Sequence, residues 1–171
     1  MNQKQENFLS QLSIEQFEKF KAIAKKKCVP ADTVVIREND LSQSFYYIAE
    51  GEVKLSKTPG GSINSPYFNL PLYESIHLKT MAAGRFIGES HFFNDNPQSY
   101  NVTSTKDTVL YELSYDKMNQ LKSTHPELYN IIMPSLCNHL SIRLENTNQL
   151  LTDEIMDRKV KLKKKNYFLR L

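Results

Sequence analysis

The residues with the clearest chemical potential lie in one segment of the chain. It reads Gly84-Arg85-Phe86-Ile87-Gly88-Glu89-Ser90-His91-Phe92-Phe93 and resumes, two residues later, as Asn96-Pro97-Gln98-Ser99-Tyr100-Asn101-Val102. A glycine that opens a short helix leaves backbone amides free, and such amides can hold an anion. The carboxylate of Glu89 beside them can accept hydrogen bonds from the hydroxyls of a sugar. The segment therefore predicts a site for a small molecule.

The sequence does not indicate an enzyme or a metal site. The four histidines are scattered and show no His-x-x-x-His spacing, and there is no nucleophile elbow, P-loop or paired-carboxylate site. His91 either faces the ligand or is an ordinary packed or surface histidine. Cys28 and Cys137 form neither a disulfide framework nor a zinc site, and their apolar surroundings predict buried thiols. We therefore expect no catalytic residue, no metal and no cofactor.

The elements that must position this segment are strands with helices on either side. Ser13-Ile14-Glu15-Gln16 is a capping box, and it opens a helix that we expect to end at the lysine triplet 25–27. From Thr33 the apolar period changes to two. Strands are expected around residues 33–37, 45–48, 52–56, 75–79, 102 and 109–113, with turn-forming residues between them. Six or more short strands of this kind predict an antiparallel barrel or sandwich.

Two longer features interrupt or follow the strands. Residues 58–71 hold three prolines and two glycines, which indicates a loop that is either functional or a tolerated insertion. After Ser114 a short helix over 115–121 is expected, then a long helix over 126–157 with a kink or restart at Pro134. Its 3-4-3-4 spacing is typical of a coiled-coil dimer seam or of a helix lying on the barrel; the seam residues are Cys137, Leu140, Leu144, Thr147 and Leu151.

Over roughly residues 8–157 the chain resembles the cyclic-nucleotide-binding domain family of bacterial catabolite-activator-type regulators and kinase regulatory subunits. The motifs that carry the resemblance are Val35-Ile36-Arg37-Glu38-Asn39-Asp40, Phe45-Tyr46-Tyr47-Ile48-Ala49-Glu50-Gly51-Glu52-Val53 and Gly84-x-Phe86-x-Gly88-Glu89. The family usually has glycine where Asn39 stands, and asparagine tolerates positive φ well. The resemblance implies an eight-stranded antiparallel β-roll, mainly β, with N-terminal helices and a long C-terminal helix that caps the pocket and often dimerises.

The resemblance also assigns roles within the segment 84–102. The family's glutamate binds the ribose 2′-hydroxyl, and Glu89 matches it. The family's arginine, about nine residues later, pairs with the cyclic phosphate, and Gln98 stands there instead. A charge-assisted hydrogen bond is worth about 1.5–3 kcal/mol, so cyclic-nucleotide binding is expected to be altered or lost. The candidate ligand-binding residues are Gly88, Glu89, Ser90, Gln98, Ser99 and Tyr100.

Charge is distributed unevenly along the chain. Residues 158–171 hold seven of the 22 basic residues and no acid, so residues 1–157 carry a net charge of −4. We expect a domain over 1–157 and a basic C-terminal tail over 158–171. The tail either contacts anionic lipid or nucleic acid, or is a solvated helix end; it also resembles the entry to a helix-turn-helix domain, so DNA is a partner only if such a domain follows. No signal peptide or membrane span is indicated, which predicts a cytoplasmic protein.

Two functions of different class follow. The first is a regulatory, ligand-sensing domain that forms a homodimer through helix 126–157 and takes a cyclic nucleotide or another small metabolite. The alternative is a degenerate scaffold or dimerisation module that binds no small molecule, and Gln98 favours it.

Overall fold

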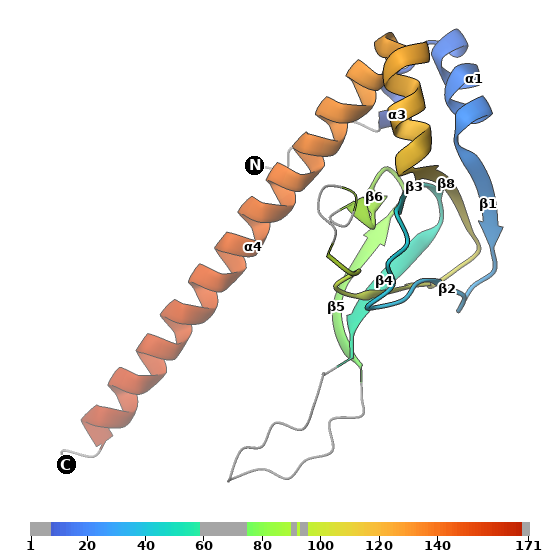
Figure 1. Cartoon of the computed structure of the whole chain (residues 1–171). Helices are drawn as coiled ribbons and strands as arrows, with labels where there is room; N and C mark the ends of the chain where they lie inside the picture. Colours follow the sequence, from blue (N-terminus) through green and yellow to red (C-terminus); the bar gives the residue numbers. More distant parts are fainter. Residues whose placement is uncertain (1–7, 59–74, 90–91, 93–95, 169–171) are drawn as a thin grey trace. The chain divides into compact units, whose positions relative to one another are not determined.

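The computed structural model describes residues 8–58, 75–89, 92 and 96–168, with side chains described as far as residue 160. Contacts divide the chain into two units, residues 1–133 and 134–171, which we describe separately. The described part of the first unit holds eight strands, with the helices η1 (Phe8–Gln11) and α1 (Ile14–Ile23) before them and α3 (Tyr115–Thr124) after them (Figure 1). The second unit is the greater part of α4 (Pro126–Phe168).

The start of α1 is fixed by the capping box that the sequence predicts. The Gln16 amide donates to Ser13 Oγ at 3.2 Å, and the Ser13 amide donates to Gln16 Oε1 at 2.9 Å. The predicted end of this helix is wrong, because the lysine triplet belongs to strand β1 (Lys25–Val29). An extended Ala24 ends the helix, and the next residues pair with a neighbouring strand.

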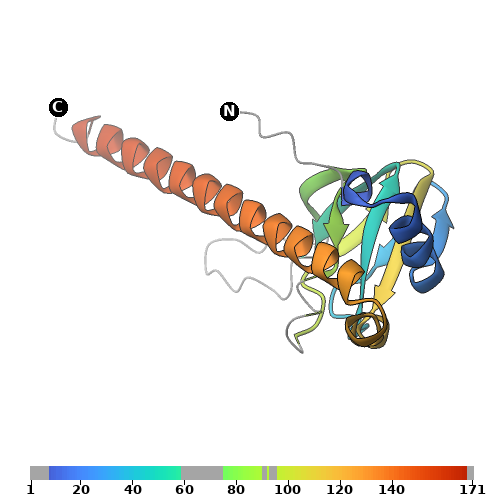
Figure 2. The same ribbon diagram turned by 90° about the horizontal axis from the view of Figure 1, so that it is seen from above.

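The strands form two four-stranded antiparallel sheets. β1 lies in the first sheet, with order β1-β8-β3-β6, which adds β8 (Thr108–Ser114), β3 (Ser44–Glu50) and β6 (Phe86–Ile87). The second sheet has the order β2-β7-β4-β5 and comprises β2 (Val34–Ile36), β7 (Asn101–Ser104), β4 (Glu52–Lys57) and β5 (Ile76–Ala82). This arrangement confirms the β-roll fold. Figure 2 shows the sheets from above.

The core between the sheets is built from alternate residues of the strands. Val53 and Leu55 of β4 are buried, as are Val102 of β7 and Ile48 and Leu110 of the first sheet. Outside this core, Phe8 packs edge-on against Phe20 and Tyr47 with ring centroids 5.4 Å apart, so η1 and α1 are held to β3 by aromatic contacts.

Strand β5 differs from the other strands in its irregular pairing and in the exposure of its first apolar residues. Its register with β4 shifts between Leu55 and Ser56, so that Leu78 has no direct partner on β4. Ile76 is 53% exposed and Leu78 is 50% exposed. The predicted strand is therefore confirmed, but Ile76 and Leu78 do not enter the core, whereas Met81 near the end of β5 does. The loop predicted over residues 58–71 lies, apart from Thr58, outside the described residues.

The C-terminal helix is longer than expected and passes through Pro134 as one element, so there is no restart there. Most seam residues are exposed on the helix: Leu144 is 63% exposed and Leu151 is 57% exposed, while Leu140 is half-buried. Cys28 and Cys137 are both exposed, which corrects the expectation of buried thiols. Among the described residues no helix has the length and apolar character needed to cross a bilayer.

Candidate functional site

The candidate site begins where β6 ends, at a residue that must be glycine. β6 pairs with β3 through Tyr46↔Ile87, and Gly88 then turns with φ +77°. A Cβ at this position would lie 2.9 Å from Ile36 Cδ1 and 3.4 Å from Gln98 Nε2. Both the left-handed backbone and the close packing exclude a side chain here, so the chain can pass tightly beside β2 and Gln98.

Gln98 is tied to this turn by its side chain and to a second turn by its backbone. Its Nε2 donates to the Gly88 carbonyl at 3.2 Å. Its amide donates to Asp40 O at 2.9 Å, and its own carbonyl accepts from the Asn39 amide at 2.8 Å. Asn39 has φ +66°, as expected for an asparagine in the family's glycine position. Gln98 therefore joins the two turns, one through its side chain and the other through its backbone.

Two polar groups are buried at this bridge. Glu89 is 0% exposed and Gln98 is 1% exposed. The Gln98 Oε1 atom is buried and accepts no hydrogen bond from any residue that the structure describes. Burying a polar atom without a partner costs about 1–3 kcal/mol, which makes this atom an acceptor ready for a donor.

The other candidate residues have different environments. Ser99 is exposed, and its carbonyl accepts from Lys57 Nζ at 3.3 Å. Tyr100 is 6% exposed and belongs to the apolar core cluster with Ile36 and Val102. Ser90 lies outside the described residues, and so does His91. The fold thus brings Gly88, Glu89 and Gln98 together, with Ser99 beside them, while Tyr100 packs into the core.

Sequence reasoning missed a polar group next to Ser99. Lys57, the last residue of β4, makes an ion pair with Glu38 at 3.5 Å. Glu38 also accepts from the Thr58 amide at 2.9 Å, and its own amide donates to Asn101 Oδ1 at 2.9 Å. No local pattern in β4 points to this lysine, because the buried Ser56 breaks the alternation that Val53 and Leu55 begin.

Tyr46 and Tyr47 of β3 are neutral phenols rather than anions. Tyr46 donates from its hydroxyl to Glu112 Oε1 at 3.1 Å, and burial, with the nearby Glu112 carboxylate, raises the pKa of this phenol. Burial also raises the pKa of Tyr47 to about 12. Both phenols therefore stay neutral at physiological pH. Among the described residues, no group of three or more His, Cys, Asp or Glu side chains is placed to hold a metal ion.

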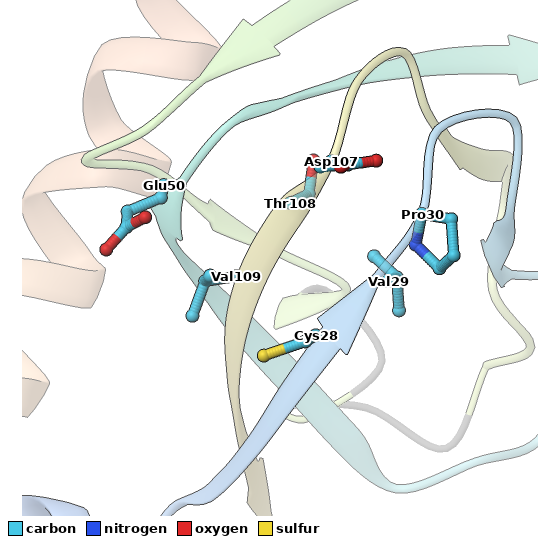
Figure 3. Close-up of a pocket in the computed structure, with 7 residues that line it drawn as sticks. All are labelled: Cys28, Val29, Pro30, Glu50, Asp107, Thr108 and Val109. Atoms are coloured by element: carbon cyan, nitrogen blue, oxygen red, sulfur yellow. The ribbon is translucent and has the colours of Figure 1, made fainter.

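A separate hollow of about 310 Å³ lies at the ends of β1, β3 and β8 and shares no lining residue with the candidate site (Figure 3). Its lining residues are Cys28, Val29, Pro30, Glu50, Asp107, Thr108 and Val109. Asp107 Oδ1 accepts from the Ala31 amide at 3.1 Å, and Thr108 Oγ1 donates to Lys106 O at 2.7 Å. These polar groups hold the turns together, so the hollow has a structural explanation.

Solved structures with the same fold include cyclic nucleotide-binding proteins. A cyclic nucleotide-binding domain from Methylobacillus flagellatus KT has a TM-score of 0.70 and 22% identity, covering 84% of this chain and 74% of that one. The Thermus thermophilus catabolite activator protein has a TM-score of 0.67 and 20% identity, covering 86% and 62%. The Xanthomonas campestris regulator CLP, described as c-di-GMP responsive, has a TM-score of 0.67 and 22% identity, covering 82% and 63%.

At these identities the structures establish the fold, and the chain spans less than two thirds of the two regulators. No curated protein sequence matches the chain at a significant level. The model of the cyclic nucleotide-binding domain family matches residues 26–125, more than half of the chain, and the chain therefore belongs to that family.

Proposed function

We propose that this chain is the ligand-sensing domain of a dimeric regulator and that it binds a small, hydroxyl-bearing molecule at Gly88, Glu89, Gln98 and Ser99. The observation that carries the proposal is the pair of buried polar side chains, Glu89 and Gln98, at the tight turn of Gly88. A carboxylate and an amide oxygen at such a site offer acceptors to ligand hydroxyls or amines. Ser90 belongs to the proposed site by its place in the chain. The role is regulatory rather than catalytic.

A cyclic nucleotide would bind this site more weakly than it binds a site with the family's arginine. Gln98 supplies no positive charge, and its Nε2 already donates to Gly88 O. Losing one charge-assisted bond of about 1.5–3 kcal/mol lowers affinity roughly ten- to a hundredfold. We therefore propose cyclic nucleotides, including dinucleotides such as the one named for the Xanthomonas campestris regulator, as the first class to test.

We further propose that two copies associate through α4. Leu144 and Leu151 are exposed on the helix one heptad apart, with Cys137 one heptad before Leu144. Exposed apolar residues at heptad spacing are typical of a coiled-coil seam, and pairing would remove them from water. Ligand binding would then act by favouring one arrangement of the helices over another, which requires different affinities for the two arrangements.

The test is a calorimetric titration of the full chain with cAMP, cGMP and c-di-GMP, supported by melting temperatures. Binding should be saturable for at least one of them, and Glu89→Ala should weaken it by tenfold or more, because the buried carboxylate would no longer meet ligand hydroxyls. Glu50→Ala, which changes an exposed carboxylate outside the site, serves as the matched control. If none of the three compounds binds or raises the melting temperature, the proposal is wrong.

The second candidate is a scaffold that binds no small molecule, and two contacts favour it. Gln98 hydrogen-bonds Gly88 within the site, and Tyr100 fills part of the core beside it. On this alternative the domain serves as a dimerisation module. It predicts that Glu89→Ala changes stability but no ligand affinity, while dimerisation persists.

A further inference from the structure

The ion pair Lys57–Glu38 is a charged group next to the candidate site, and the sequence motifs did not point to it. Lys57 Nζ donates to the carbonyl of Ser99 at 3.3 Å, and Ser99 directly follows Gln98. No lysine or arginine lies in the segment between Arg85 and Lys106. A positive charge therefore sits one residue from Gln98, although it comes from β4 rather than from the segment itself.

The register of the second sheet places Lys57 near the residues that precede β7. β4 pairs with β7 through Val53↔Ser104 and Leu55↔Val102, without a shift. Val53, Leu55, Val102 and Ser104 are all buried. Ser56 pairs with Asn101, so the next residue, Lys57, lies opposite the residues that precede β7. Ser56 is buried as well, and the alternation of buried and exposed residues ends there. The Lys57 side chain is 50% exposed, and its Nζ contacts Glu38 and the Ser99 carbonyl.

Glu38 forms a long ion pair with Lys57. The separation of Lys57 Nζ and Glu38 Oε1 is 3.5 Å, and the Glu38 side chain is 13% exposed. The second carboxylate oxygen, Oε2, accepts from the Thr58 amide at 2.9 Å. The carboxylate is thus fixed by backbone, while the half-exposed lysine is held at longer distances, 3.5 Å from Glu38 and 3.3 Å from the Ser99 carbonyl.

We propose that Lys57 is the cation that meets the anionic group of the ligand, in place of a basic residue at position 98, and that Glu38 competes with the ligand for it. This inference rests on the proposed function of the same site. The ligand class it implies carries hydroxyls for Glu89 and a phosphate or carboxylate group for Lys57. The competing carboxylate sets the affinity for the anion, because the lysine must leave Glu38 to bind it.

The test measures the affinity of the full chain for cAMP in three variants. Lys57→Met keeps the aliphatic stem without the charge and should weaken binding roughly five- to tenfold. This factor is smaller than for a buried charged group, because solvent screens the half-exposed lysine. Glu38→Gln keeps an oxygen for the Thr58 amide and should tighten binding about threefold, because the competing charge is gone. Lys54→Met changes a lysine between the buried Val53 and Leu55 of the same strand; it is the control and should match the wild type.

Salt provides a second readout. The wild-type affinity should fall as ionic strength rises, and this dependence should be reduced in Lys57→Met, because the screened attraction involves that charge. If the wild type binds cAMP and Lys57→Met binds it equally well, the inference is wrong and the proposed function stands. If Glu38→Gln weakens binding as Lys57→Met does, the pair is only a structural support and the inference is again wrong. If the wild type does not bind cAMP, this inference is wrong. The proposed function is then tested separately, by the titrations with cGMP and c-di-GMP.

Discussion

Replacing Gln98 by arginine tests most directly how the site's chemistry depends on one residue. In the free domain, Gln98 is 1% exposed and its Nε2 donates to Gly88 O at 3.2 Å. An arginine at this position would lose that bond. It would also bring a second positive charge near Lys57, whose Nζ donates to the carbonyl of the next residue, Ser99. Gln98→Arg should therefore lower the melting temperature of the free protein and raise its affinity for an anion.

Both effects have estimable sizes. The lost neutral hydrogen bond is worth about 0.5–1.5 kcal/mol, and an incompletely paired buried charge adds to this cost, so the free domain should lose roughly 1–4 kcal/mol of stability. A bound phosphate offsets part of this loss of stability through a charge-assisted hydrogen bond of about 1.5–3 kcal/mol. The affinity for cAMP should accordingly rise by roughly ten- to a hundredfold.

The assay is a calorimetric titration of wild type and Gln98→Arg with cAMP, with melting curves at several ligand concentrations. Gln98→Met is the matched control, because it fills similar space, lacks the bond to Gly88 and carries no charge; it should lose stability without gaining affinity. A folded Gln98→Arg protein whose dissociation constant equals that of the wild type would falsify our explanation of why position 98 limits nucleotide binding.

Three further predictions concern stability and assembly. Gly51→Ala should destabilise the domain by roughly 2–4 kcal/mol in urea unfolding, because a Cβ there lies 2.5 Å from Asp107 O at φ +87°; Gly84→Ala, at φ +90° with nothing within 4 Å, should cost only about 1–2 kcal/mol. An equal loss in both variants would contradict the packing argument. Ser13→Ala should remove the capping box of α1 and cost about 1 kcal/mol; no change in the unfolding midpoint would mean that the cap contributes nothing. Leu144→Glu with Leu151→Glu should convert a dimer to a monomer in sedimentation velocity, whereas Leu150→Glu, an exposed leucine off the seam, should not; a dimer that persists in the double variant would place the interface elsewhere.

The parts of the fold that the sequence predicts are those set by local patterns. The capping box at Ser13 and the alternation in β4 and β8 each reflect contacts that neighbouring residues determine among themselves. The triplet 25–27 is misassigned because lysines suit the end of a helix, whereas pairing with β8 makes these residues part of a strand. Long-range pairing of this kind is not visible in a local pattern.

In the candidate site, too, local contacts can be predicted from the sequence and long-range contacts cannot. Gly88 and Glu89 follow from a short motif, and the bond from Gln98 to Gly88 joins residues ten apart. Lys57 lies 42 residues from Ser99 in the chain, and only the pairing of β4 with β7 brings the two together. The exposure of Cys28 depends in the same way on which face of β1 the sheet leaves open.

The shifted register of β5 bears on how the domain avoids unwanted association. β5 is the last strand of its sheet, and the edge of a sheet offers backbone groups to any extended chain, a common route to aggregation. Here the bulge at Leu78 interrupts the regular ladder, and the exposed Lys79 places a positive charge beside it. Bulges and lysines on edge strands act against edge-to-edge pairing. Two copies in solution are thereby discouraged from joining sheets through β5, which is compatible with the proposed association through α4.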